Sequence, residues 1–107
     1  MNFEDYQKEA KKTAIYPRKH KIFYPTIGLA GEAGEVANKV KKLMRDKGRL
    51  NATSKAEIAL ELGDCLWYIA AITSDLGYSL DRIAQLNLIK LKSREIRGRL
   101  KGSGDKR

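Results

Sequence analysis

The stretch GLAGEAGEVANKVKKLMRD, residues 28–46, raises the question on which the interpretation of the fold depends. Its apolar residues recur with the spacing of an amphipathic helix, yet its start contains three glycines, each of which costs a helix interior up to about 1 kcal/mol relative to alanine. Two glutamates, Glu32 and Glu35, stand among these weak helix formers. The glycines are Gly28, Gly31 and Gly34. The question is why a helix places three weak helix formers beside two carboxylates.

The composition is typical of a single compact helical domain. The chain has 107 residues, of which 42% are hydrophobic and 33% charged, with only two prolines. The single cysteine, Cys65, excludes an internal disulfide framework and fits a reducing compartment. No apolar run approaches the roughly 18 residues of a membrane span, and the N-terminus lacks an apolar signal core. We therefore expect a soluble, cytoplasmic protein with no membrane partner.

The formal net charge of +9 is concentrated near the C-terminus. Residues 90–107 contain eight basic and two acidic side chains. An excess of this kind suggests a polyanionic partner. A solvated face or a frayed tail is an equally simple interpretation.

Four helices are expected from the capping and breaking signals. The first runs from Phe3 to Tyr16 after Asn2, and the second from near Pro25 to near Gly48. Ser54 is expected to cap the third, with Glu57 completing a capping box and Gly77 at its end. Ser79 is expected to cap a fourth helix that reaches about Gly98. No segment shows strand alternation.

These signals predict an all-α fold, a subunit of the four-helix-bundle type. The domain is expected to span residues 1–98, and residues 99–107 to form a flexible basic tail. Because so short a chain buries only a modest core, self-association as a homodimer or homotetramer is expected.

The acids of the second and third helices occupy matching positions. At about 100° per residue, Glu32 and Glu35 lie at one edge of an apolar stripe, about 60° apart. Glu61 and Asp64 repeat this layout on the next helix. If the two stripes pack together, four carboxylates can converge, and a divalent cation such as Mg²⁺ would relieve their repulsion. The glycines would then allow another helix or a ligand to approach closely. Ordinary solvated glutamates, paired along the helix as Glu35 with Lys39, are the alternative.

The segments GEAGEV and ELGDCLWYI together resemble the MazG-like, all-α nucleoside triphosphate pyrophosphohydrolases. The family pattern is E-x-x-E, a variable spacer, then E-x-x-D, and KVKKLMRD and NLIKLKSR also look like this family. The resemblance implies a dimer or tetramer in which Mg²⁺, with Mn²⁺ as a possible substitute, is held by Glu32, Glu35, Glu61 and Asp64. It also implies hydrolysis between the α- and β-phosphates of a nucleotide to the monophosphate and pyrophosphate. Glu35 is the candidate for orienting the attacking water.

Asn87, Lys90 and Arg94 share one side of the fourth helix and are candidate contacts for the substrate phosphates. A capped amide beside two solvated cations is the alternative for this set. Lys39 and Lys42 share an edge with the acids and are further candidates.

Two other functions stay open. One is a relative with a narrow substrate, such as dUTP, dCTP or phosphoribosyl-ATP. The other is a non-enzymatic helical protein that binds nucleic acid or regulates through its basic C-terminus. The paired acids favour the enzyme, because carboxylates beside phosphodiesters would repel them without a metal, and a nucleic-acid partner is not expected.

Overall fold

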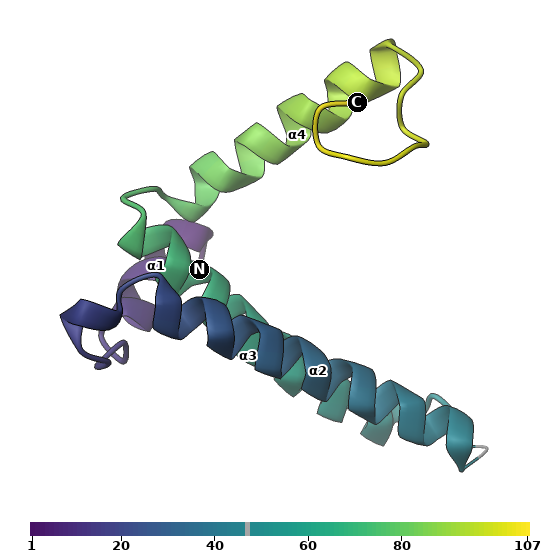
Figure 1. Ribbon diagram of the computed structural model, residues 1–107. Helices are drawn as coiled ribbons and strands as arrows, with labels where there is room; N and C mark the ends of the chain where they lie inside the picture. Colours follow the sequence, from purple (N-terminus) through teal and green to yellow (C-terminus); the bar gives the residue numbers. More distant parts are fainter. Residues whose placement is uncertain (47) are drawn as a thin grey trace.

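The computed structural model describes residues 1–46 and 48–107, and all the regular secondary structure among them is helical (Figure 1). The elements are α1 (Phe3–Lys11), a single 3₁₀ turn η1 (Arg18–His20), α2 (Phe23–Arg45), α3 (Ala52–Asp75) and α4 (Leu80–Ile96). No strand occurs among these residues, so the predicted all-α class is confirmed. None of the described helices is long and apolar enough to cross a membrane.

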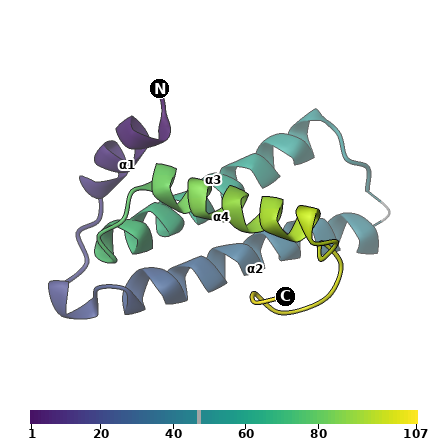
Figure 2. The same ribbon diagram turned by 90° about the horizontal axis from the view of Figure 1, so that it is seen from above.

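The two longest helices, α2 and α3, run side by side as an antiparallel hairpin (Figures 1 and 2). The short α1 packs on the C-terminal half of α3, where the Trp67 indole N–H donates to the Thr13 hydroxyl at 2.8 Å. Helix α4 contacts α1 and the end of α3, then leads away from the hairpin (Figure 1). A single chain is therefore open on one side, with α4 as an arm.

Local capping explains most helix ends. The side chains of Asn2 and Ser79 accept the N–H groups of Asp5 and Arg82, as expected for the predicted N-caps of α1 and α4. The helix α3 ends in a Schellman motif, with Gly77 at a φ of +80° and the Tyr78 N–H bonded to the Thr73 carbonyl at 3.0 Å.

The predicted start of α3 is wrong by one turn. Asn51 is the N-cap, and Ser54 is the third helical residue. The Asn51 carboxamide accepts the Ser54 N–H, and the Ser54 hydroxyl accepts the Asn51 N–H, both at 2.9 Å. This reciprocal pair is the capping box, so Glu57 has no part in it.

The predicted first helix is too long at its C-terminal end. Helix α1 ends at Lys11, and Tyr16 lies in the connector. There the Tyr16 hydroxyl donates to Asp75 at 2.7 Å, and its ring stacks on Tyr24 with centroids 4.9 Å apart. These contacts need an extended connector, which overrides the local helix signal.

The buried core lies at the corner where α1, α3 and α4 meet. Ala70, Ala71 and Leu80 are its buried apolar side chains. The Gln7 side chain crosses this corner: its amide N–H group donates to the Ser74 hydroxyl and the Tyr78 carbonyl, and its oxygen accepts the Leu80 N–H. Elsewhere large apolar side chains remain exposed, among them Phe23, Ile27, Met44 and Leu60.

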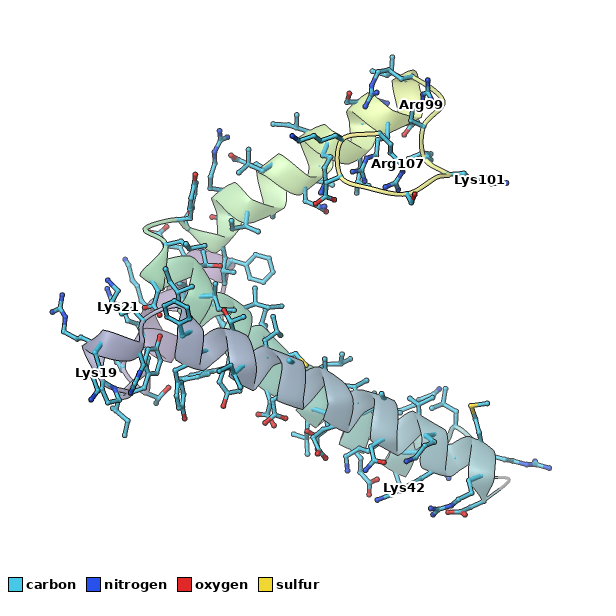
Figure 3. The ribbon with its side chains drawn as sticks, viewed as in Figure 1. Lys19, Lys21, Lys42, Arg99, Lys101 and Arg107 are labelled. Atoms are coloured by element: carbon cyan, nitrogen blue, oxygen red, sulfur yellow. The ribbon has the colours of Figure 1, made fainter. Side chains whose placement is uncertain are left out.

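The C-terminal tail folds back along α4 (Figure 3). The Arg94 guanidinium donates to the Asp105 carbonyl at 2.9 Å, and the Arg97 guanidinium donates to the Arg107 carbonyl at 2.7 Å. Gly102 and Gly104 adopt positive φ values of 125° and 85° and allow the reversal. The division of the chain at residue 98 stays a prediction.

Candidate metal centre

Three carboxylates from two helices meet in the middle of the α2–α3 hairpin. Glu32 comes from α2, and Glu61 and Asp64 come from α3. One oxygen of each lies within 4.8 Å of the others. The E-x-x-D spacing places Glu61 and Asp64 about one helical turn apart on a shared edge, so packing α3 against α2 brings both to Glu32.

The three carboxylates repel one another when all are ionised. The pKa of Glu32 is raised above its usual value, first by partial burial and then by the charges of Asp64 and Glu61. A hydrogen bond with Glu61 and the charge of Glu35 act in the same direction. On the other side of the cluster, the Lys39 ammonium lies 3.7 Å from a Glu61 oxygen and partly compensates it. A second cation placed among the three carboxylates would relieve the repulsion that remains.

Glu35 lies outside this group of three. Its side chain is exposed on α2, one turn after Glu32. It is still close enough for its charge to raise the pKa of Glu32. Of the four predicted acids, the structure therefore brings three within bonding distance of one ion and leaves the fourth at their border.

The donor set fits a small, hard divalent ion. Mg²⁺ prefers oxygen ligands, retains several waters and is commonly held by one or two carboxylates together with substrate phosphates. Glu32, Glu61 and Asp64 supply only oxygen, and Asp64 is exposed enough to leave one side of the cluster open to a ligand. No histidine or cysteine among the described residues joins the group.

A tyrosine, Tyr68 of α3, lies beside the acids and is not among the predicted site residues. The pKa of Tyr68 is raised by burial, by Tyr24, and then by the charges of Glu32 and Asp64, so its ring lies next to the cluster. A Cβ on Gly28 would overlap that ring, with its Cδ1 atom 2.6 Å away. The sequence signal was a glycine one turn before Glu32 and an aromatic residue one turn after Asp64.

The other two glycines of α2, Gly31 and Gly34, have no close neighbour of the kind that Gly28 has in Tyr68. Around Gly31 and Gly34 no atom lies within 4 Å of where a Cβ would stand, apart from the adjoining residues and backbone of α2 itself. Gly28 therefore accommodates a helix already present in the chain, while Gly31 and Gly34 leave the surface beside Glu32 and Glu35 uncovered.

The predicted phosphate contacts on α4 lie apart from the acids within one chain. Asn87 is exposed, whereas Lys90 is bonded to the Asp105 carboxylate at 3.2 Å. Arg94 is 5% exposed and donates to the Asp105 and Gly104 carbonyls. Because α4 leads away from the hairpin, its C-terminal half does not reach the acidic cluster (Figure 1).

Lys39 and Lys42 are placed differently from the α4 set. Lys39 contacts Glu61 directly, and both lysines line a shallow cavity of about 280 Å³ between α2 and the start of α3. Lys42 lies toward the tip of the hairpin (Figure 3). These two cations therefore extend the site along the hairpin, away from the corner of the fold.

The comparisons with known proteins point to one family. The model of the MazG nucleotide pyrophosphohydrolase domain matches residues 26–97, a range that contains every candidate site residue. The "Gene 37 protein" of Mycobacterium phage L5 is 45% identical over the full length of both chains. No solved structure gives a significant match.

Proposed function

Because the chain belongs to the MazG nucleotide pyrophosphohydrolase family, we propose that it hydrolyses nucleoside triphosphates between the α- and β-phosphates. The products are the nucleoside monophosphate and pyrophosphate. The observation that carries the proposal is the convergence of Glu32, Glu61 and Asp64 within 4.8 Å, from two helices inside the matched range. Three acids beside an uncovered surface suit a cation-dependent reaction on a polyphosphate.

Glu32, Glu61 and Asp64 would hold Mg²⁺, for which Mn²⁺ can substitute. The bound ion neutralises polyphosphate charge and makes water more acidic. Lys39, paired with Glu61 at 3.7 Å, lies where it can balance a phosphate oxygen as a point charge. Lys42 continues that positive edge along α2.

Glu35 is proposed to orient the attacking water and accept its proton. It forms no ion pair among the described residues and is exposed at the border of the cluster. A carboxylate in that position can reach a water near the phosphate without coordinating the metal ion.

Assembly is the proposed route by which α4 joins the site. Phe23, Ile27 and Leu60 are each more than 70% exposed, so the single chain leaves apolar area on the hairpin for a partner copy. In a homodimer or homotetramer, α4 of one copy can present Asn87, Lys90 and Arg94 to the acids of another. The Asp105 carboxylate, which pairs with Lys90 here, occupies the kind of place that a phosphate would take.

A turnover screen of the ribo- and deoxyribonucleoside triphosphates with Mg²⁺ tests this function. We expect monophosphate and pyrophosphate, separated by chromatography, and no turnover with EDTA. Diphosphate with orthophosphate would reject the proposed bond. The Glu61→Gln variant, checked for an unchanged circular dichroism spectrum, is the matched control for contaminating phosphatases, since it lacks one of the clustered carboxylates.

A further inference from the structure

A cavity at the other end of the hairpin is built from cations that the proposed reaction does not use. It has a volume of about 240 Å³ and lies under the connector between α1 and α2. Its floor is formed by the buried Ala70 and Ala71 of α3. Asp75, on its wall, follows Asp64 by eleven positions in α3, which is about 16 Å along the helix. The cavity is therefore distinct from the acidic cluster.

The charges around this cavity are unbalanced. Lys11, Arg18 and Lys21 line it, and none of them forms an ion pair with any residue that the structure describes. Asp75 is the single acid in the lining. The C-terminal ends of α1 and α3 add partial negative charge, about half an elementary charge each. Three full positive charges exceed these contributions, so an excess of positive charge remains.

Asp75 is already engaged in holding the connector. One of its oxygens accepts the Tyr16 hydroxyl at 2.7 Å and the Ile22 N–H at 2.9 Å. Ile22 has a φ of +69°, a region that is a genuine outlier for a β-branched residue. The stacking of Tyr16 on Tyr24 fixes the same segment to α2. Backbone strain that the surroundings hold in place is typical of binding and functional sites.

We propose that this cavity binds a small inorganic phosphate anion, with pyrophosphate preferred over orthophosphate. Lysine and arginine supply the charge-assisted hydrogen bonds that phosphate oxygens need. The Ser74 hydroxyl, which also lines the cavity, can donate a further one. The volume is below the roughly 300 Å³ of most drug-sized ligand sites, which favours an anion without a nucleoside. Pyrophosphate carries the greater charge and matches three cations better.

Calorimetric titration of the full chain with pyrophosphate and with orthophosphate, both in EDTA, tests the proposal. EDTA removes divalent ions, so the acidic cluster cannot capture a metal–pyrophosphate complex. We expect Arg18→Gln and Lys21→Gln each to weaken pyrophosphate binding about tenfold. Lys19→Gln is the matched control: Lys19 lies in the same connector (Figure 3) but does not line the cavity, and its change should be less than about twofold.

Two further outcomes complete the test. The Asp64→Asn variant should bind pyrophosphate as the parent protein does, which separates this site from the proposed catalytic centre. An equal loss in Lys19→Gln, a loss in Asp64→Asn, or no binding at about 5 mM pyrophosphate would each overturn the proposal. Orthophosphate binding more tightly than pyrophosphate would overturn the stated preference.

Discussion

The α2–α3 hairpin and the α4 arm use their charges in opposite ways. The hairpin brings like charges together: Glu32, Glu61 and Asp64 converge, and their mutual repulsion contributes to the raised pKa of Glu32. The arm engages two of its own cations instead, because Lys90 and Arg94 bind the folded-back tail. Under the proposed function, the hairpin would receive the metal and substrate, whereas Lys90 and Arg94 would have to release the tail before they could contact a phosphate.

The strongest test of this contrast is removal of one clustered carboxylate. Asp64→Asn should lower kcat/KM on the order of a thousandfold, because a bound metal contributes several kcal/mol of charge stabilisation. Mg²⁺ affinity should fall with it, while circular dichroism stays unchanged. Asp81→Asn, an exposed acid in the first turn of α4 outside the cluster, is the control. Near-parent turnover in Asp64→Asn would remove the cluster from the mechanism.

Glu35 tests whether the acids of the hairpin have different roles, three as metal ligands and one as a general base. Because it lies outside the group of three, Glu35→Gln should reduce kcat by about a hundredfold, as expected for loss of a general base. Metal affinity, measured by calorimetry, should stay within a few-fold of the parent value. A large loss of metal affinity would instead make Glu35 a ligand.

Lys90 tests whether the arm cooperates with the hairpin. If it contacts the polyphosphate, Lys90→Ala removes a charge-assisted contact worth roughly 1.5–3 kcal/mol, and kcat/KM falls about tenfold to a hundredfold. Metal affinity without nucleotide should not change. Lys92→Ala, which breaks only a surface pair with Glu95, is the control. An unchanged kcat/KM in Lys90→Ala would leave α4 without a role in the site.

Alanine substitutions at two glycines of α2 should change the free energy of unfolding by smaller amounts and in opposite directions. Gly28→Ala should lower the free energy of unfolding by about 1–2 kcal/mol, because overlap with the Tyr68 ring outweighs the gain in helix propensity. Gly31→Ala, with open space around it, should raise this free energy by up to about 1 kcal/mol. Urea denaturation measures both. Equal effects at the two positions would contradict the close approach of Tyr68.

The smallest effect concerns the tail. The Lys90 and Arg94 charges hold the pKa of Asp105 below its usual value, first through the hydrogen bond from Lys90. The contribution of Asp105 to docking is therefore complete above the ordinary aspartate pKa and is lost as the pH falls through the lower value. The amide resonances of Gly102 and Gly104 should therefore shift as the pH falls below the ordinary aspartate pKa of about 3.9, not above it. The same titration of Asp105→Asn should lack this transition.

The features that could be predicted from the sequence are those determined by interactions between residues close together in the chain. The N-caps Asn2 and Ser79 and the all-α class follow from neighbouring residues. Ser54 was misplaced because Asn51 and Ser54 can each cap a helix, and only their reciprocal pairing in the structure shows which one begins it. The C-terminal end of α1 depends on contacts of Tyr16 with residues far along the chain, which spacing cannot show.

The acidic site was predictable in part for the same reason. Matching E-x-x-E and E-x-x-D edges predicted that two helices would bring carboxylates together, and three of them lie within 4.8 Å. Glu32 and Glu35 have the same three-residue spacing as Glu61 and Asp64, yet Glu32 joins the group and Glu35 stays exposed at its border. The spacing alone therefore does not decide which acids converge; the packing of α2 against α3 does. The fit of Tyr68 against Gly28 and the cavity under the connector join residues distant in sequence, and no periodic pattern reports them.

The Gln7 side chain has a consequence for the order of folding. Its three hydrogen bonds join positions separated by 67 to 73 residues, while the hairpin closes through a short loop. Closing the longer loop carries the greater entropy loss, so the hairpin should form early and the corner late. The direction in which α4 leaves the corner would then be set last. In the parent protein, amide protection at Leu80 should appear after that in α2 and α3, and Gln7→Ala should abolish it at Leu80, whose N–H loses its acceptor, while leaving the early protection in α2 and α3 intact.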